Sequence, residues 1–211
     1  MESMKILICD DHKIVRDGLK QILQQLSEVT FIGEARGGNE VSILLKADVF
    51  EVVLLDISLP DQNGLEVLKS IKSKWPKTNV LMLSMHPQEQ YAIRALKLGA
   101  SGYLTKDTAA EELILAINKV SGGGKYISQS LAENLALHLD DDMLRQKHEI
   151  LSNREFEIMI KIANGMSLQE IGNELFISVK TVSTYRYRIM EKMGLRKNTE
   201  LTRYCMENKL I

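Results

Sequence analysis

The sequence contains no uninterrupted apolar run that approaches the roughly 18 residues of a membrane helix. Its start also lacks the basic stretch and apolar segment that together mark a secretory signal peptide. These absences argue against an integral membrane protein and against a secreted one. We therefore expect a cytoplasmic protein with no membrane partner.

Cysteine is scarce, since Cys9 and Cys205 are the only two in the chain. Neither lies in a spacing typical of a metal site. Cys9 ends an apolar strand-like run, and Cys205 falls in a helical pattern near the C-terminus. We expect both to be small packing residues rather than redox or metal-binding groups.

No charge sign dominates the chain, which has 27 Lys+Arg, 28 Asp+Glu and a net charge of −1. The balance differs along the sequence when it is divided at the glycine cluster 122–124. Residues 1–121 hold 14 basic and 16 acidic residues, residues 122–148 hold 3 and 4, and residues 149–211 hold 10 and 8. The excess of +2 in the last part is too small to establish a nucleic-acid partner.

The length of 211 residues exceeds the common single-domain size of about 100–150 residues, so we expect two domains. Residues 1–121 alternate short apolar runs with helical patterns, which is typical of βα units around a parallel sheet. The expected strands cover 5–9, 29–34, 51–55, 79–84 and 101–104. The third is apolar nearly throughout, as expected for a central strand covered by helices on both faces.

After the glycine cluster the pattern breaks down. Residues 122–148 are expected to form a linker with a helical segment near residues 131–139. The acidic run 140–142 in this linker is more typical of a solvated charge cluster than of a metal site. Every segment of residues 149–211 has a helical pattern, so we expect a small all-α second domain.

Charged residues follow three of the expected strands in the first domain. Asp10 and Asp11 follow the first strand, Asp56 ends the third, and Lys106 follows the fifth. Parallel strands would bring all of them to one edge of the sheet, where open α/β sheets bind ligands. Any one of them alone would more simply be a strand-end cap or a solvated loop residue, but their ordered recurrence favours a shared site.

Converging carboxylates repel one another, and a divalent cation with oxygen ligands, most often Mg²⁺, relieves that repulsion. Asp56 stands alone on the central strand and is the candidate nucleophile, while Asp10 and Asp11 are expected to hold the metal. Lys106 would neutralise phosphoryl oxygens. The turn after Asp56 leaves a backbone carbonyl, that of Ser58, as a further metal ligand. At the end of the fourth strand, the hydroxyl of Ser84 is placed to bond a phosphoryl oxygen.

Residues 1–121 resemble the receiver domain of two-component response regulators. The motifs that carry the resemblance are 8–12, 55–60, 83–85 and 102–106. The resemblance implies a phosphoacceptor at Asp56, an acidic metal pocket at Asp10 and Asp11, a switch hydroxyl at Ser84, a rotating aromatic at Tyr103 and a phosphate-contacting lysine at Lys106. It also implies a flavodoxin-like, doubly wound five-stranded parallel sheet, a Mg²⁺ or Mn²⁺ cofactor, and a sensor histidine kinase or small phosphodonor as the phosphoryl source.

A short helix over 167–175, a tight turn and a longer helix over 179–193 predict a helix-turn-helix in the second domain. The longer helix carries four basic residues, opposed by Glu191 alone. A single basic helix of this kind is as well explained by a solvated amphipathic face. The neighbouring motifs 151–155, 162–165, 170–172, 175–178, 180–182 and 192–195, however, resemble the LuxR/FixJ-type DNA-binding domain, and 181–188 is similar to the GacA/UvrY branch.

The LuxR/FixJ resemblance implies that the longer helix enters the major groove of promoter DNA. Ser183, Thr184 and Tyr187 share the face expected to meet base edges, and four basic residues are better placed for phosphates. The expected contacts are Lys180, Thr181, Ser183, Thr184, Arg186, Tyr187, Arg188 and Lys192. The last helical stretch, 199–206, carries apolar groups that the core of one domain could absorb, but the resemblance implies that this helix makes dimer contacts. A two-fold dimer would place two recognition helices about one DNA turn, roughly 34 Å, apart.

The sequence therefore predicts a DNA-binding response regulator, in which phosphorylation of Asp56 controls dimerisation and DNA binding. It predicts a signal input rather than an enzyme, apart from assistance to its own phosphorylation and dephosphorylation. Two other classes are weaker alternatives. A regulator gated by protein interaction would leave the acidic pocket without a role, and an aspartate-nucleophile phosphatase or mutase would leave the helical domain unexplained.

Overall fold

The computed structural model describes residues 3–85, 89–128, 131–132, 147–208 and 210–211. The chain divides into two compact units, Met1–Leu135 and Ala136–Ile211. This division falls inside the segment expected to be a linker. The helical segment expected near 131–139 lies mostly outside the described residues, and the acidic run 140–142 lies entirely outside them. Among the described helices none is long and apolar enough to cross a membrane.

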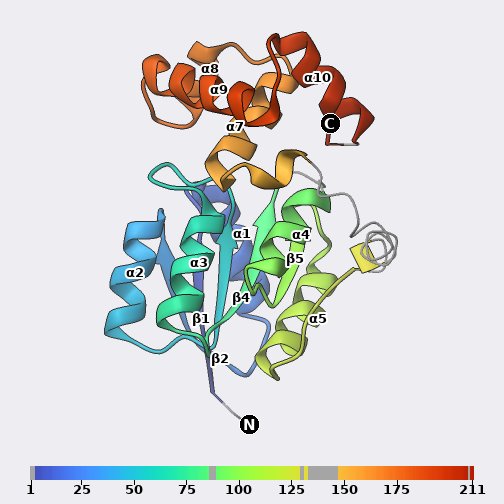
Figure 1. Cartoon of the computed structure of the whole chain (residues 1–211). Coiled ribbons are helices and arrows are strands. Elements are labelled where there is room, and N and C mark those ends of the chain that lie inside the picture. Colours follow the sequence, from blue (N-terminus) through green and yellow to red (C-terminus); the bar gives the residue numbers. More distant parts are fainter. Residues whose placement is uncertain (1–2, 86–88, 129–130, 133–146, 209) are drawn as a thin grey trace. The chain divides into compact units, whose positions relative to one another are not determined.

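The first unit contains the expected five-stranded parallel sheet, drawn in Figure 1. Its strands, in chain order, are β1 (Met4–Cys9), β2 (Val29–Ala35), β3 (Val52–Asp56), β4 (Asn79–Ser84) and β5 (Gly102–Thr105). They lie in the order β2-β1-β3-β4-β5, with every neighbouring pair parallel. The predicted α/β fold class is confirmed, and β3 is the central strand as expected.

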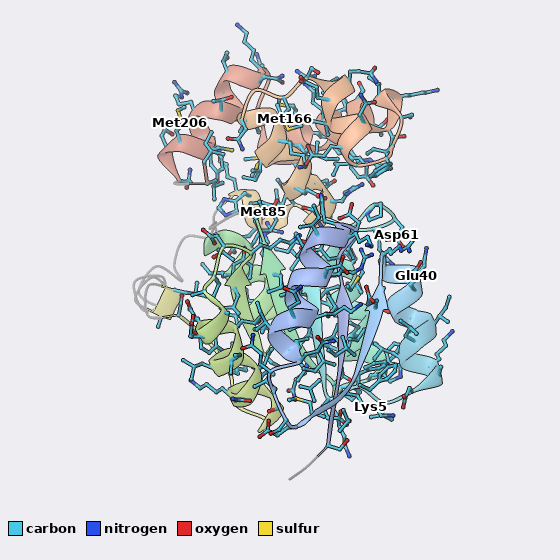
Figure 2. All side chains as sticks on the ribbon, turned by 180° about the vertical axis from the view of Figure 1, so that it is seen from behind. Lys5, Glu40, Asp61, Met85, Met166 and Met206 are labelled. Atoms are coloured by element: carbon cyan, nitrogen blue, oxygen red, sulfur yellow. The ribbon has the colours of Figure 1, made fainter. Side chains whose placement is uncertain are left out.

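Helices cover both faces of this sheet. They are α1 (Lys13–Leu23), α2 (Gly38–Ala47), α3 (Gly64–Lys74), α4 (Glu89–Lys97) and α5 (Ala110–Ser121). The α1 helix packs beside α5 on one face, while α2, α3 and α4 pack in succession on the other (Figures 1 and 2). This two-sided cover explains why all five residues of β3 are buried.

A chain segment beyond α5 also belongs to the first unit. Tyr126 forms a parallel bridge with Gly102, at the free edge of β5, and its N–H donates to the Ser101 carbonyl at 2.8 Å. Its hydroxyl is hydrogen-bonded to Glu112 of α5 at 2.7 Å, and burial raises the pKa of Tyr126 to about 12. The segment thereby covers an edge strand that would otherwise leave unpaired backbone groups.

The second unit consists of a short 3₁₀ helix, η1 (Lys147–Ile150), followed by α7 (Asn153–Ala163), α8 (Leu168–Glu174), α9 (Val179–Met193) and α10 (Asn198–Glu207). Capping boxes formed by Ser152 with Glu155 and by Ser167 with Glu170 fix the first turns of α7 and α8. Gly194, in the left-handed conformation, ends α9. The predicted helix-turn-helix is confirmed as α8, a short turn and α9.

Packing explains the sharp turn between α8 and α9. The Ile177 N–H donates to the Gly172 carbonyl at 2.9 Å, and a Cβ on Gly172 would lie 2.8 Å from the Ile177 carbonyl oxygen. Phe176 takes a φ of 52°, which is uncommon for a residue other than glycine. The close backbone approach therefore requires glycine at position 172.

Both cysteines are buried, and no other group of the described residues bonds to them covalently. Burial raises the pKa of each thiol, that of Cys205 to about 12. A thiol with a raised pKa is a poor nucleophile at neutral pH. These properties agree with a packing role.

Candidate functional site

The parallel register of β1, β3 and β5 brings the predicted site residues to one edge of the sheet. Cys9 lies beside Leu55, so the carboxylates of Asp10 and Asp56 follow paired positions. Ser84 lies beside Thr105, which places Ser84 next to the residue that precedes Lys106. The structure thus brings together the residues that the sequence placed after separate strands.

Lys106 lies between two buried carboxylates. Its Nζ is 2.6 Å from Asp10 Oδ2 and 2.7 Å from Asp56 Oδ2. The Lys106 backbone N–H donates to the Ser84 carbonyl at 2.7 Å, which fixes the start of the loop after β5. Burial alone would lower the pKa of this ammonium, but attraction to Asp56 and Asp10 outweighs burial and raises it. Lys106 is therefore held as a cation.

Asp56 has an unusual proton affinity for an aspartate. Burial raises its pKa from 3.8 to about 6, although the Lys106 ammonium and the backbone N–H of Ser58 act in the opposite direction. At neutral pH the group is still mainly ionised. A buried, ionised and only partly compensated carboxylate is a suitable nucleophile.

The acidic pocket has the ligand chemistry of a divalent cation site. Ligand atoms of Asp10, Asp11, His12 and Asp56 lie within 4.8 Å of one another. Asp10 Oδ2 and Asp11 Oδ1 are buried and each has one nitrogen neighbour, Lys106 Nζ at 2.6 Å and His12 Nδ1 at 2.8 Å, which leaves acceptor capacity on both oxygens. Two carboxylate oxygens with unused acceptor capacity, beside the Asp56 carboxylate, fit a hard cation such as Mg²⁺.

His12 and Arg16 belong to this site, although the sequence reasoning assigned them no role. His12 Nδ1 lies 2.8 Å from Asp11 Oδ1 and 3.2 Å from Asp10 Oδ1. The buried Arg16 donates to the Asp10 carbonyl at 2.8 Å and to Glu34 at 3.1 Å. Direct succession to the acidic pair is a sequence signal for His12. Arg16 lies one turn into α1, which begins directly after His12, and this spacing is a signal for the arginine.

The loop after Asp56 is held close to the strand that it leaves. The Gly64 N–H donates to the Ile57 carbonyl at 2.7 Å, and a Cβ on Gly64 would overlap the Asp56 carbonyl oxygen. Ser58 and Asn63 form an antiparallel bridge across the loop, and the Asn63 side chain caps α3. Glycine at position 64 therefore permits the return of the chain beside Asp56.

Ser84 and Tyr103 are linked within the described structure. Both are buried, and a hydrogen bond between their side chains partly offsets the effect of burial, which raises the pKa of Tyr103 to about 12. The negative charge of Asp56 raises this pKa further. The Tyr103 hydroxyl therefore already points to the Ser84 side of the pocket.

In the second unit, α9 exposes the residues expected to contact DNA. Val182 and Ile189 are buried, as predicted, and face the core of the unit. Most of the expected contacts are exposed and Arg186 is half-buried; the exposed ones are Lys180, Thr181, Ser183, Thr184, Tyr187, Arg188 and Lys192. Tyr187 retains 66% of its accessible surface, a large fraction for an aromatic residue.

Two of these side chains have partners inside the unit. Arg186 Nε donates to Asn198 Oδ1 at 2.8 Å, which ties α9 to α10. Lys192 Nζ lies 2.7 Å from Oε2 of Glu155, the buried carboxylate of the first capping box. Lys192 thus stabilises the start of α7, a role that its sequence position did not reveal.

Two family models match the chain in separate segments. Residues 6–118 match the response regulator receiver domain, and residues 149–205 match the bacterial regulatory proteins of the luxR family. The two matches coincide with the sheet unit and the helical unit. Together they leave the segment between α5 and η1 outside either family.

Full-length relatives share this combination. The response regulator UvrY of Escherichia coli is 33% identical over 98% of this chain and 95% of its own. The oxygen regulatory protein NreC of Staphylococcus haemolyticus is 34% identical over 99% of both chains. Both alignments cover nearly the whole of each chain.

Solved structures agree with these relatives. RcsB from Salmonella enterica serovar Typhimurium, bound to the promoter P1flhDC in the presence of the phosphomimetic BeF₃⁻, has a TM-score of 0.62 and 27% identity over 96% of this chain and 98% of that chain. A structure of two RcsB dimers bound to two parallel DNAs has a TM-score of 0.61 and 26% identity, over 97% and 98%. Both describe a protein of the same two-part organisation.

Proposed function

Because the chain belongs to the two-component response regulators that join a receiver domain to a luxR-type DNA-binding domain, we propose that phosphorylation of Asp56 controls its binding to promoter DNA. Residues 1–121 carry the phosphoacceptor, 122–148 form the linker and 149–211 bind DNA. Near the start of the linker, Tyr126 extends the first domain by its bridge to Gly102 of β5.

Asp56 is the nucleophile in this proposal. A carboxylate oxygen attacks the phosphorus atom of a phosphohistidine or small phosphodonor, and an O–P bond forms while the bond to the leaving group breaks. The leaving group departs with the electron pair, and the product on Asp56 is an acyl phosphate. A pKa of about 6 supports this role, because the carboxylate is mainly ionised near pH 7.

Asp10, Asp11, Asp56 and the backbone carbonyl of Ser58 hold a divalent cation, Mg²⁺ or Mn²⁺. When bound, this cation neutralises phosphoryl oxygens and the carboxylates that surround them. The unused acceptor capacity of Asp10 Oδ2 and Asp11 Oδ1 supports the assignment. Ser58 already donates its N–H to the Asp56 carboxylate, which keeps the two residues in register.

Lys106 supplies a fixed positive charge beside the nucleophile. Its contacts of 2.6 and 2.7 Å to Asp10 and Asp56 keep the ammonium beside the position that a phosphoryl oxygen of the product would take. Because the pKa of Lys106 is raised, the charge persists through the physiological pH range. The lysine thus stabilises the additional negative charge that Asp56 gains when it is phosphorylated.

Ser84 and Tyr103 form the switch. A phosphoryl oxygen on Asp56 competes for the Ser84 hydroxyl, so it alters the hydrogen bond that joins Ser84 to Tyr103. Tyr103 then changes its position, and this movement alters the outer face of the first domain. The altered face favours dimerisation or release of the DNA-binding domain. Such a switch is a population shift between two arrangements of the same chain.

The α9 helix reads the major groove, with Ser183, Thr184 and Tyr187 toward bases and Lys180, Thr181, Arg186, Arg188 and Lys192 toward phosphates. Exposure of most of these side chains supports the assignment. A homodimer would carry two such helices to adjacent half-sites. The partners in this proposal are a sensor histidine kinase, promoter DNA and a second copy of the chain, in the cytoplasm.

The single observation that carries this proposal is the Lys106 ammonium held between the Asp10 and Asp56 carboxylates. Incubation of the purified chain with a radiolabelled small phosphodonor and Mg²⁺ tests it. The wild-type protein should acquire one acid-stable, base-labile phosphoryl group, and Asp56→Asn should acquire none. Undiminished labelling of Asp56→Asn would contradict the assignment.

Binding to a random-sequence DNA pool, with and without beryllofluoride and Mg²⁺, tests the second half of the proposal. Beryllofluoride should increase the recovery of a defined sequence by the wild-type protein and not by Asp56→Asn. Equal recovery under both conditions by the wild-type protein would support a regulator that is gated by protein interaction instead. The selected sequence would also define the operator.

A further inference from the structure

Asp61 joins two segments that are distant in sequence. It lies in the loop between Asp56 and α3, and its carboxylate accepts the backbone N–H groups of Gly38 at 3.0 Å and Asn39 at 2.9 Å. These are the first residues of α2, whose N-terminal N–H groups have no partner within the helix. One carboxylate from the loop therefore caps a helix that precedes it by more than twenty residues.

The Asp61 carboxylate can take this position because Gly37 has no side chain. That residue has an extended backbone, with a φ of −169°, which any amino acid can adopt. A Cβ at this position would, however, lie 2.7 Å from Asp61 Oδ1 and 2.9 Å from its carboxyl carbon. Space rather than backbone conformation thus favours glycine here, and Asp61 fills that space.

The loop that carries Asp61 has other attachments near its ends. The Ile57 N–H donates to the Leu83 carbonyl of β4 at 3.2 Å, Gly64 is bonded back to Ile57, and Ser58 is bridged to Asn63. None of these three attachments reaches α2. Asp61 supplies hydrogen bonds to α2, three residues after Ser58.

We propose that Asp61 is a positioning residue for the divalent cation site. By binding the start of α2, it fixes the loop 57–63 and so holds the Ser58 carbonyl in place as a metal ligand. This inference rests on the proposed function, since it assigns Asp61 to the same metal site. Without Asp61 the carboxylates of the pocket stay in place, but the carbonyl ligand loses its support.

Glu40 offers a matched control for the charge of Asp61. It lies in the first turn of α2, near the same end of the helix as Asp61 (Figure 2), and accepts the Arg36 N–H at 2.8 Å. Burial is the main reason why the pKa of Cys9 is raised, and the charges of both Asp61 and Glu40 raise it further. The two carboxylates thus act on the same end of β1, but only Asp61 comes from the loop.

The experiment measures Mg²⁺ affinity by titration calorimetry on the full-length chain. Asp61→Ala should weaken Mg²⁺ binding about tenfold, in the range found when support for a metal ligand is lost. Glu40→Ala should change it by less than about twofold, because it removes a solvent-screened charge and a hydrogen bond to Arg36 that does not involve the loop 57–63. Asp61→Asn should lie between, since its amide oxygen can accept one of the two N–H groups.

A rate measurement separates positioning from general damage. Phosphorylation of Asp61→Ala by a small phosphodonor should be slow at limiting Mg²⁺ and return to the wild-type rate at saturating Mg²⁺. An equal deficit at all Mg²⁺ concentrations would overturn the positioning role, and so would a Mg²⁺ affinity of Asp61→Ala equal to that of Glu40→Ala. Wild-type protein that bound no Mg²⁺ would instead overturn the proposed function itself.

Discussion

Replacement of Asp56 by asparagine should make the first unit more stable while it removes the proposed phosphoacceptor. The pKa of Asp56 is about 6, against 3.8 in an exposed aspartate, because burial disfavours its charged form. At about 1.4 kcal/mol per pKa unit, the ionised group costs the fold about 3 kcal/mol near neutral pH. Asparagine has nearly the same shape, carries no charge and can still accept the Ser58 N–H.

The expected gain depends on pH in a defined way. A carboxyl with a raised pKa in the folded state binds protons more tightly when folded, so its ionisation destabilises the fold as pH rises. The penalty is absent below pH 3.8, grows between about pH 4 and 6 and is complete above that range. The advantage of Asp56→Asn over the wild type should therefore increase from pH 4.5 to about pH 6 and be level by pH 7.5.

Urea unfolding in the presence of a chelator measures this difference. Trp75, at the end of α3, is the only tryptophan in the chain, so its fluorescence follows the first unit. A gain of about 3 kcal/mol corresponds to a rise in melting temperature of roughly 10 °C for a unit of this size. Asp17→Asn is the control, because the Asp17 side chain keeps 48% of its accessible surface and its ion pair among the described residues is with Lys13, at 3.4 Å.

The control should change stability by no more than about 0.5 kcal/mol. Two results would refute the reasoning. One is an Asp56→Asn protein that is less stable than the wild type at pH 7.5. The other is a stability difference that does not change between pH 4.5 and 7.5, since that would place its origin outside the titration of Asp56.

Three further predictions concern single contacts. Lys106→Met should lower the stability of the first unit by about 3 kcal/mol, measured by the same fluorescence titration, because two buried carboxylates lose their cation; an unchanged midpoint would contradict the importance of the pair. Gly64→Ala should shift the Asp56 loop and prevent phosphorylation in the phosphodonor assay, because its Cβ overlaps the Asp56 carbonyl oxygen; full labelling would show that the loop can yield. Lys192→Ala should lower the melting temperature of the second unit as well as weaken DNA binding, since it also breaks a pair with a buried carboxylate, whereas Lys180→Ala should weaken DNA binding without the fall in melting temperature; an unchanged melting temperature of Lys192→Ala would contradict the importance of its pair with Glu155.

The linker start shows how a local pattern and the tertiary structure differ in what they reveal. In sequence, the glycine cluster 122–124 ends the periodic pattern, and nothing after it has the alternation of a strand. In the structure, Tyr126 nevertheless pairs with the edge of β5 and is bonded to Glu112 of α5. A single bridge has no periodicity, so only the position of the sheet edge could reveal it.

The helix-turn-helix shows the same difference within one helix. The spacing of Val182 and Ile189 was enough to predict which side of α9 is buried, because one helical turn repeats every 3.6 residues. It could not distinguish Lys192 from Lys180, since both are basic residues on the polar side. The distinction comes from Glu155, which the packing of α7 against α9 brings within 2.7 Å of Lys192.

The sequence by itself determined the order of strands and helices and the central position of β3, and it led to the proposal of Asp56 as nucleophile. These features follow from the periodicity of apolar residues and from which charged residues come after which strand, and both are local properties of the chain. Only the tertiary structure decided that Lys106 lies between two carboxylates, that His12 and Arg16 belong to the pocket, and that Asp61 holds its loop against α2. Such contacts join residues far apart in sequence, and packing of whole elements against one another sets their distances.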